Sequence, residues 1–223
     1  MNKSQTFKVI ISHKYKLIFF SNPKTGSESI RRLLGPISEE KIVVYRNVND
    51  ETPFYSHITP LETKLIFDKK GLPFTQYNRL VFIRNPFDRI LSLFKMLTRN
   101  RDFDKELFNR WVSTIDNKGA GGGGNDLDRW RKYGTYSIYN FINNENGNPL
   151  VTKIIRLEDV EKDLIKYLTI IGVPKLITDQ SIPFINKSGK IETNILEKYS
   201  DKNIDRMLKL YGKEISEFGY GFE

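Results

Sequence analysis

Cysteine is absent from the sequence of 223 residues, and histidine occurs only twice. A chain without thiols forms no disulfide, holds no thiolate zinc site and has no cysteine nucleophile, which excludes zinc fingers and cysteine proteases. Long apolar runs are missing as well, because the longest, residues 16–20 and 80–83, are strand-sized, whereas a membrane-spanning helix needs roughly 20 apolar residues. The N-terminal residues show no signal-peptide pattern. We therefore expect a cytoplasmic protein with no membrane partner.

Positive charge exceeds negative charge along the chain. The 36 lysines and arginines outnumber the 27 aspartates and glutamates, which gives a net charge of +9. Such an excess favours anionic partners, for example nucleic acid, a lipid surface or a phosphorylated small molecule. The charges are spread without a basic block, which favours a local anion site over a nucleic-acid-binding arm. The length fits a single domain over residues 1–223 with its own core.

Short apolar segments alternate with segments of helical periodicity. Buried strands are expected at residues 16–20, 79–84 and 151–156, with a further strand at 42–45. Helices are expected at residues 27–34, 58–69, 86–94, 102–115, 136–142, 158–171 and 194–218. This alternation predicts an α/β fold in which a central parallel sheet has helices on both faces and binds its ligand at the carboxyl ends of the strands. The glycine-rich run at 119–124 is expected to be a flexible loop.

The first motif joins the first predicted strand to the helix that follows, and reads Asn-Pro-Lys-Thr-Gly-Ser-Glu-Ser at residues 22–29. Backbone N–H groups and the positive end of a helix dipole converge at such a loop, which favours a phosphate. Lys24 adds a positive charge, Gly26 lets the backbone approach a ligand, and hydroxyl donors stand at Thr25, Ser27 and Ser29. The same residue types are common helix caps, so the loop alone leaves both interpretations open.

The second motif, Arg-Asn-Pro-Phe-Asp-Arg-Ile-Leu-Ser, occupies residues 84–92. Arg84 stands at the end of a predicted strand and Ser92 two turns into the next helix, so both are placed to bind one anion beside the sheet. An ion pair between Arg84 and Asp88 is the alternative, and the motif alone favours neither.

Four motifs then stand in a characteristic order. Pro-Lys-Thr-Gly at 23–26 and Arg-x-Pro-Phe-x-Arg-x-x-Ser at 84–92 are followed by Arg-Leu-Glu-Asp-Val at 156–160 and Pro-Phe-Ile-Asn-Lys-Ser at 183–188. In this order they resemble the motifs of sulfotransferases that use 3′-phosphoadenosine 5′-phosphosulfate (PAPS), particularly the carbohydrate (heparan and chondroitin uronosyl type) superfamily. The resemblance implies a three-layer, P-loop-like fold. It also implies transfer of a sulfuryl group from PAPS to a hydroxyl of a glycan or a small alcohol, without a metal, leaving adenosine 3′,5′-bisphosphate (PAP).

The same resemblance implies roles for individual residues. The 5′-phosphosulfate would be held by Lys24, Thr25, Gly26, Ser27, Glu28 and Ser29. The 3′-phosphate would be held by Arg84 and Ser92, and a loop over the nucleotide would be formed by Asn186, Lys187 and Ser188. The implied partner is a hydroxyl-bearing acceptor, with an anionic glycan as one form, and no nucleic acid.

His57 lies in the segment Tyr-Ser-His-Ile-Thr between the first two motifs. A group that takes a proton from an alcohol at neutral pH is best a histidine, although a single histidine is more often an ordinary surface or core residue. The segment resembles the Gly-His-[VIL]-[ST] segment that supplies the general base in uronosyl sulfotransferases. The resemblance therefore implies that His57 and Lys24 are catalytic, whereas no role is expected for His13.

Two other functions remain as alternatives. The net charge and aromatic content suit a non-catalytic module that binds a nucleotide or a nucleic acid. A nucleotide kinase is the second alternative, but the lysine precedes the glycine of the first motif, unlike the G-x-x-x-x-G-K-[ST] pattern of P-loop enzymes.

Several further residues are expected to be structural. Glu158 and Asp159 are expected to cap the helix that they open, and Arg156 to pair with a carboxylate. Trp111 and Trp130 are expected in the core, with stacking on a sugar as the alternative.

Overall fold

The computed structural model describes residues 9–99, 101–117, 134–178 and 194–220. The chain groups into two compact units, and each is described by itself. The first unit comprises Met1–Ile83 and Ile142–Ile185, and the second comprises Arg84–Phe141 and Asn186–Glu223. That all 223 residues act as one domain stays a prediction. No helix in the described parts of the chain is long and apolar enough to cross a membrane.

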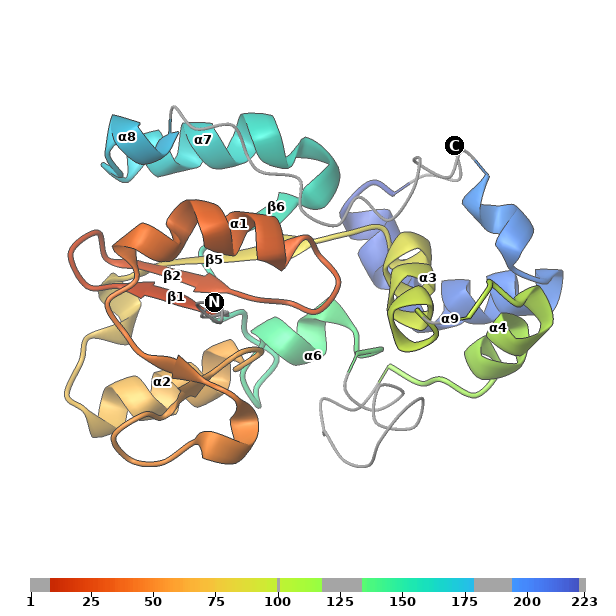
Figure 1. The fold of residues 1–223 in the computed structure, drawn as a ribbon, viewed down its shortest axis with the longest axis horizontal. Helices are drawn as coiled ribbons and strands as arrows, with labels where there is room; N and C mark the ends of the chain where they lie inside the picture. The colour runs from red at the N-terminus through yellow and green to blue at the C-terminus, as the bar shows by residue number, and fades with distance from the viewer. Residues whose placement is uncertain (1–8, 100, 118–133, 179–193, 221–223) are drawn as a thin grey trace. The chain divides into compact units, whose positions relative to one another are not determined.

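A four-stranded sheet forms the centre of the first unit, with the strand order β1-β2-β5-β6 (Figure 1). Its strands are β1 (Ile10–Ser12), β2 (Leu17–Phe20), β5 (Asn78–Ile83) and β6 (Lys153–Arg156). The inner pairs β2–β5 and β5–β6 are parallel, with Phe20 opposite Val81 and Ile83 opposite Arg156. These three strands and the mostly parallel α/β fold were predicted, whereas β1, which pairs antiparallel with β2, was not.

One face of this sheet is covered by α1 (Ser27–Leu34), α7 (Val160–Ile170) and α8 (Lys175–Thr178) (Figure 1). Leu17, Phe19, Leu80, Phe82 and Ile155 point from alternate strand positions into the apolar core that these helices close. From α1 and α7 the core receives Ile30, Leu33, Leu34, Leu164 and Leu168. The core therefore fixes both helices that border the motifs at residues 22–29 and 156–160.

The opposite face carries α2 (Pro60–Lys69) (Figure 1). Thr59 and Glu62 form a capping box at its start, and Pro60 takes the first helical position. The helix predicted at 58–69 is thus confirmed. The ring of Phe67 packs edge-on against Phe74 and Tyr77.

A smaller two-stranded parallel sheet in the first unit joins β3 (Ile42–Val43) to β4 (Phe54–Tyr55). The predicted strand at 42–45 is thus only two residues long and lies outside the central sheet. Val44 and Tyr45 do not continue it, because the chain turns into a 3₁₀ helix (Tyr45–Asn47) in which their side chains are exposed.

The junction after β6 tests the structural expectations for its charged residues. Arg156 Nε lies 3.3 Å from Asp159 Oδ2, which confirms that Arg156 pairs with a carboxylate. The capping expectation is wrong for Asp159, which stands at the N-cap position of α7 but makes no capping hydrogen bond with its side chain. Its carboxylate is paired with Arg156 instead.

The second unit is helical, with α3 (Pro86–Leu97), α4 (Lys105–Val112), α6 (Ile138–Ile142) and α9 (Asp201–Glu217). Asn85 caps α3 by accepting from the Phe87 N–H at 3.0 Å. Trp111 is buried against Phe94 and Phe108, so its stacking on a sugar is ruled out. Trp130 and the glycine-rich run at 119–124 lie outside the described residues.

Buried polar groups join α3 to α9 in this unit. Arg89 donates to the carbonyl oxygens of Gly134 and Tyr136, both at 3.0 Å. Its guanidinium lies 5.4 Å from the ring centroid of Tyr211, and Glu214 accepts from the Ile138 N–H at 2.8 Å. Burial raises the pKa of Glu214 above its ordinary value, against the opposing attraction of Arg89.

Candidate active site

The loop of residues 21–26, here called the phosphate loop, leads from β2 to α1 in the first unit. Asn22 is buried and its amide donates to the Phe82 carbonyl at 3.2 Å, which ties the loop to β5. The buried Thr25 hydroxyl donates to the Asn22 carbonyl at 2.8 Å. Its proton is therefore used inside the loop, and Thr25 can offer a ligand its backbone N–H rather than a hydroxyl donor.

Two residues of the phosphate loop have left-handed backbone. Lys24 has φ of +64° and Gly26 has φ of +73°. Alternation of right- and left-handed residues turns successive N–H groups toward one side and forms an anion-binding concavity. Gly26 is the N-cap of α1 and brings no side-chain cap, so no capping side chain stands between the first turn of the helix and an anion. The helix dipole adds positive potential there.

Gly26 is also packed closely against the junction after β6. A Cβ atom at this position would lie 2.5 Å from Leu157 Cδ1. Leu157 itself packs against the core under α1 and α7. The motif at 156–160 thus contacts the phosphate loop directly. A side chain at position 26 would have to adopt a left-handed backbone and displace the end of the Leu157 side chain.

His57 follows β4 and lies beside the start of the phosphate loop. Its Nδ1 is 2.6 Å from the carbonyl oxygen of Ser21. A carbonyl oxygen only accepts, so Nδ1 carries the proton, and in the neutral ring the lone pair is on Nε2. The side chain of Ser21 is held in turn, because Arg31 Nη1 donates to its Oγ at 3.2 Å. His57 is half-buried, whereas Ser21 and Arg31 are buried.

The predicted 3′-phosphate residues lie at the start of the second unit. Arg84 Nη2 is 3.7 Å from Asp88 Oδ1, at the outer limit of an ion pair, and both side chains are partly exposed. The alternative role of Arg84 in an ion pair is therefore seen, but the contact is too long to occupy the guanidinium fully. Ser92 is half-buried on α3. That both residues bind the 3′-phosphate of the donor stays a prediction.

The family is decided by a comparison with models of known protein families. The model of the sulfotransferase family matches residues 7–221, nearly the whole chain. This chain belongs to the sulfotransferase family. Neither a search of curated proteins nor a search of solved structures finds a match. The sulfotransferase is thus an enzyme that transfers a sulfuryl group to a hydroxyl-bearing acceptor, which favours this function over the binding module and the nucleotide kinase.

For the other predicted site residues of the sulfotransferase, the structure gives a position in the fold for some and none for the rest. Ser27 and Glu28 form the start of α1, and Ser29 is buried in the same turn. Asn186, Lys187 and Ser188 lie outside the described residues. Their roles toward a nucleotide stay predictions.

Sequence reasoning missed Ser21, Arg31 and Leu157. Arg31 had a detectable signal, because it stands three residues before Leu34 on the helix face that packs on the sheet. An arginine on an apolar face needs a polar partner, and here that partner is Ser21.

Apolar side chains of the sulfotransferase are exposed in the segment between β3 and β4. Val44, Tyr45 and Val48 are all exposed, and Tyr45 shows 71% of its surface. The ring of Tyr45 touches that of Tyr55 edge-on, with 4.9 Å between centroids. Tyr55 is held by its hydroxyl, which donates to Glu62 at 2.6 Å, and it precedes His57 by two residues. We call Val44, Tyr45 and Val48 the apolar patch.

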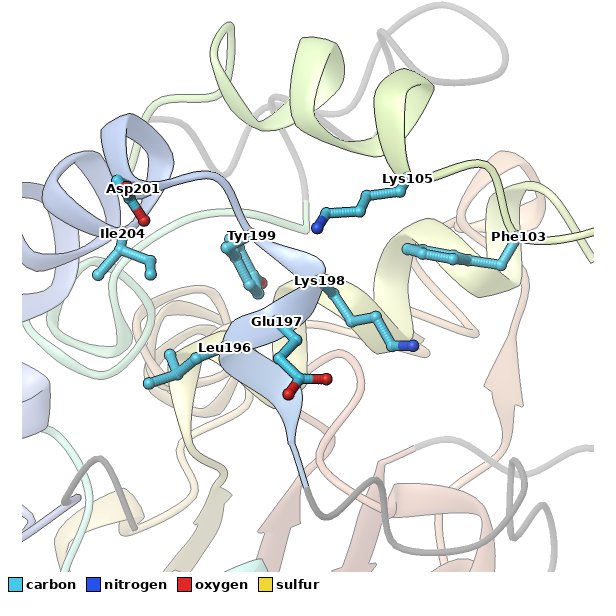
Figure 2. A pocket seen from close by; sticks show the side chains of 8 residues that line it. All are labelled: Phe103, Lys105, Leu196, Glu197, Lys198, Tyr199, Asp201 and Ile204. Carbon is cyan, nitrogen blue, oxygen red and sulfur yellow. The ribbon is translucent and has the colours of Figure 1, made fainter.

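A separate hollow of about 670 Å³ lies in the second unit of the sulfotransferase (Figure 2). It is lined by Phe103, Lys105, Leu196, Glu197, Lys198, Tyr199, Asp201 and Ile204. The Lys198 ammonium is 5.7 Å from the Phe103 ring centroid. Two lysines and two acidic residues share the lining, so it favours no ligand of one charge. Of the predicted site residues that the structure describes, none lines this hollow.

Proposed function

We propose that this sulfotransferase uses PAPS as its donor and moves the sulfuryl group to a hydroxyl of a glycan or a small alcohol, with His57 as the general base. The observation that carries this proposal is the 2.6 Å contact between His57 Nδ1 and the Ser21 carbonyl. It places a histidine with a basic Nε2 at the entrance of the loop that suits a phosphosulfate. The succession of β2, phosphate loop and α1 is also what a P-loop-like fold requires.

The phosphate loop fits the 5′-phosphosulfate of the donor. Its left-handed residues and the uncapped start of α1 offer backbone N–H groups and positive potential to an anion. Lys24 adds a positively charged ammonium, and the absence of a Cβ at Gly26 lets the anion come close to the backbone. By the resemblance of their motifs, Arg84 and Ser92 would hold the 3′-phosphate, with Asn186, Lys187 and Ser188 over the nucleotide.

PAPS supplies the sulfuryl group and leaves as PAP. His57 Nε2 accepts the proton of the acceptor hydroxyl as the oxygen attacks the sulfur, and the Ser21 carbonyl stabilises the charge that the ring gains. Lys24 neutralises negative charge on the departing phosphate oxygen. The loop holds the two oxygens in line with the sulfur, as in phosphoryl transfer.

The apolar patch suits the acceptor. The hydroxyl that reacts must lie within hydrogen-bonding reach of His57, so the rest of the acceptor covers the surface around this residue. A sugar ring presents C–H groups on its face and hydroxyls at its rim, and the exposed Tyr45 ring suits both.

The test uses purified protein, PAPS labelled with ³⁵S, and desulfated heparan, desulfated chondroitin and simple alcohols as acceptors. His57→Gln should lower kcat by about 10²–10⁴-fold and leave PAP affinity, measured by calorimetry, unchanged. His13→Gln is the matched control, because His13 contacts Tyr77 and Glu40 rather than the phosphate loop. Full activity of His57→Gln would refute the base, and equal affinity for PAP and adenosine 5′-phosphosulfate would refute the 3′-phosphate site.

A further inference from the structure

We propose that Arg31 and Ser21 are positioning residues that hold His57 in its reactive tautomer and tie the base to the phosphate loop. This inference rests on the proposed role of His57 as the base. It goes beyond that role by naming the residues that set the orientation of the ring and by linking the orientation to the loop that takes the donor.

Arg31, Ser21 and His57 form a continuous chain of contacts inside the first unit, which passes through the side chain and the main-chain carbonyl of Ser21. Arg31 Nη1 donates to Ser21 Oγ at 3.2 Å, and Ser21 in turn presents its carbonyl oxygen to His57 Nδ1 at 2.6 Å. Ser21 is fully buried and Arg31 is 9% exposed. The Arg31–Ser21 bond is thus shielded from water, which would otherwise replace either partner, whereas the bond to the half-buried His57 is only partly shielded.

Arg31 can hold Ser21 in place because its own helix is fixed. Ile30, Leu33 and Leu34 of α1 belong to the apolar core on the sheet. The backbone that carries the Arg31 side chain is therefore held in place by core packing. Ser21 follows β2 directly and lies between two rigid elements. The carbonyl of Ser21 is therefore positioned by β2, while Arg31 holds the side chain of the same residue.

The tautomer decides whether His57 can act as a base toward the acceptor. A carbonyl at Nδ1 requires the proton on that nitrogen and leaves Nε2 as the proton acceptor. If the carbonyl turned away, the proton could reside on Nε2, and the nitrogen that faces the acceptor would no longer accept. Displacements near 1 Å in a positioning group can change turnover by about 10²-fold.

The same geometry couples the base to the donor. Ser21 is the first residue of the phosphate loop, and α1, which carries Arg31, begins where the loop ends. A shift of the loop moves the Ser21 carbonyl and with it the His57 ring. Donor binding and alignment of the base are then linked through one residue.

The experiment reads the tautomer directly, without an acceptor. Long-range ¹H–¹⁵N spectra of protein labelled at histidine nitrogen distinguish Nδ1–H from Nε2–H, and with only two histidines in the chain, His13→Gln assigns the signals. We expect the Nδ1–H form for His57 in the wild type. In Arg31→Met the Nε2–H form should appear and kcat should fall by about 10²-fold, with partial recovery in Arg31→Lys.

Two further variants keep the test decisive. Ser21→Ala removes the acceptor of the Arg31 bond but keeps the carbonyl, so the same changes should appear with smaller amplitude, even if Arg31→Met fails to fold. Arg32→Met removes an exposed arginine from the neighbouring position of α1 and should change neither tautomer nor turnover.

The outcomes separate the inference from the proposed function. An Nε2–H ring in the wild type overturns the inference, as does an unchanged tautomer and turnover in Ser21→Ala and Arg31→Met, or in Ser21→Ala alone if Arg31→Met fails to fold. If these variants shift the tautomer while His57→Gln keeps full activity, the positioning stands and the proposed base is wrong. If His57→Gln is inactive and the tautomer ignores Arg31 and Ser21, the base stands and the positioning is wrong.

Discussion

Replacing Gly26 by alanine should destabilise the protein for two separable reasons. The backbone at Gly26 has φ of +73°, and an L-residue pays about 1–2 kcal/mol to adopt left-handed geometry. The new Cβ would also lie 2.5 Å from Leu157 Cδ1, and overpacking of this kind costs about 1–3 kcal/mol. Gly26→Ala should therefore lower the free energy of unfolding by about 2–5 kcal/mol.

Two other glycines of the first unit isolate the backbone contribution. Gly71 and Gly172 have φ of +67° and +78°, and a Cβ at either would meet nothing within 4 Å. Alanine at these positions should lower the free energy of unfolding only by the conformational part, about 1–2 kcal/mol. The difference between Gly26→Ala and these controls measures the clash with Leu157.

The double variant Gly26→Ala with Leu157→Ala completes a thermodynamic cycle. Removing the leucine branch relieves the clash, so the two substitutions together should cost about 1–3 kcal/mol less than the sum of their separate effects. Urea unfolding followed by circular dichroism gives all four free energies, and PAP titration gives the matching affinities. A Gly26→Ala protein no less stable than Gly71→Ala, or a cycle that closes without coupling, would refute the close packing of the motif at 156–160 on the phosphate loop.

The remaining predictions concern both units. Arg84→Ala should weaken PAP binding by about 1.5–3 kcal/mol. Asp88→Asn should strengthen PAP binding, because the Asp88 carboxylate, 3.7 Å from Arg84 Nη2, no longer competes with the phosphate for the guanidinium. Unchanged calorimetric affinities would contradict both predictions. Burial raises the pKa of Glu214 above its ordinary 4.5. Between 4.5 and the raised pKa, the native state therefore binds more protons than the unfolded state. Because of this carboxyl, the free energy of unfolding should fall as pH rises through that range. Glu214→Gln should remove that fall, and identical pH dependence of unfolding in the two proteins would refute the effect. Tyr45→Ala should raise the KM for a glycan acceptor by about 3–10-fold at constant kcat. Ile170→Ala, which removes another exposed apolar side chain, should leave the KM unchanged. Equal effects of the two substitutions would reject the apolar patch as the acceptor surface.

Local signals in the sequence were sufficient for much of the fold. The runs of β2 and β5 are continuously apolar because parallel strands are buried on both faces, and α3 is marked by its cap and first-turn proline. β1 was missed because it has only three residues and is defined by its pairing with β2, which no periodicity reveals. The strand at 42–45 was overextended because its apolar residues indicate a strand, although Val44 and Tyr45 turn outward instead of pairing.

Part of the candidate site was likewise predictable from the sequence and part of it was not. The phosphate loop was predictable because strand, lysine, glycine and helix are consecutive in the chain. The contacts that support it were not, because Ser21 meets His57 and Gly26 meets Leu157 only after folding brings distant segments together. The bond that fixes the tautomer of His57 involves a main-chain carbonyl, and a sequence carries no sign of which carbonyl a side chain will meet.

Because Lys24 has a left-handed backbone, a substitution at this position can stabilise the protein and still lower its turnover. Glycine at position 24 would relieve about 1–2 kcal/mol of backbone strain. This gain in stability is offset in part because glycine has greater conformational freedom in the unfolded chain. The same substitution would remove the ammonium group from the phosphate loop. A library screened for heat resistance alone would thus accept changes at this position that a library screened for product formation would reject. Engineering of this enzyme should therefore keep residue 24 fixed and seek added stability elsewhere in the chain.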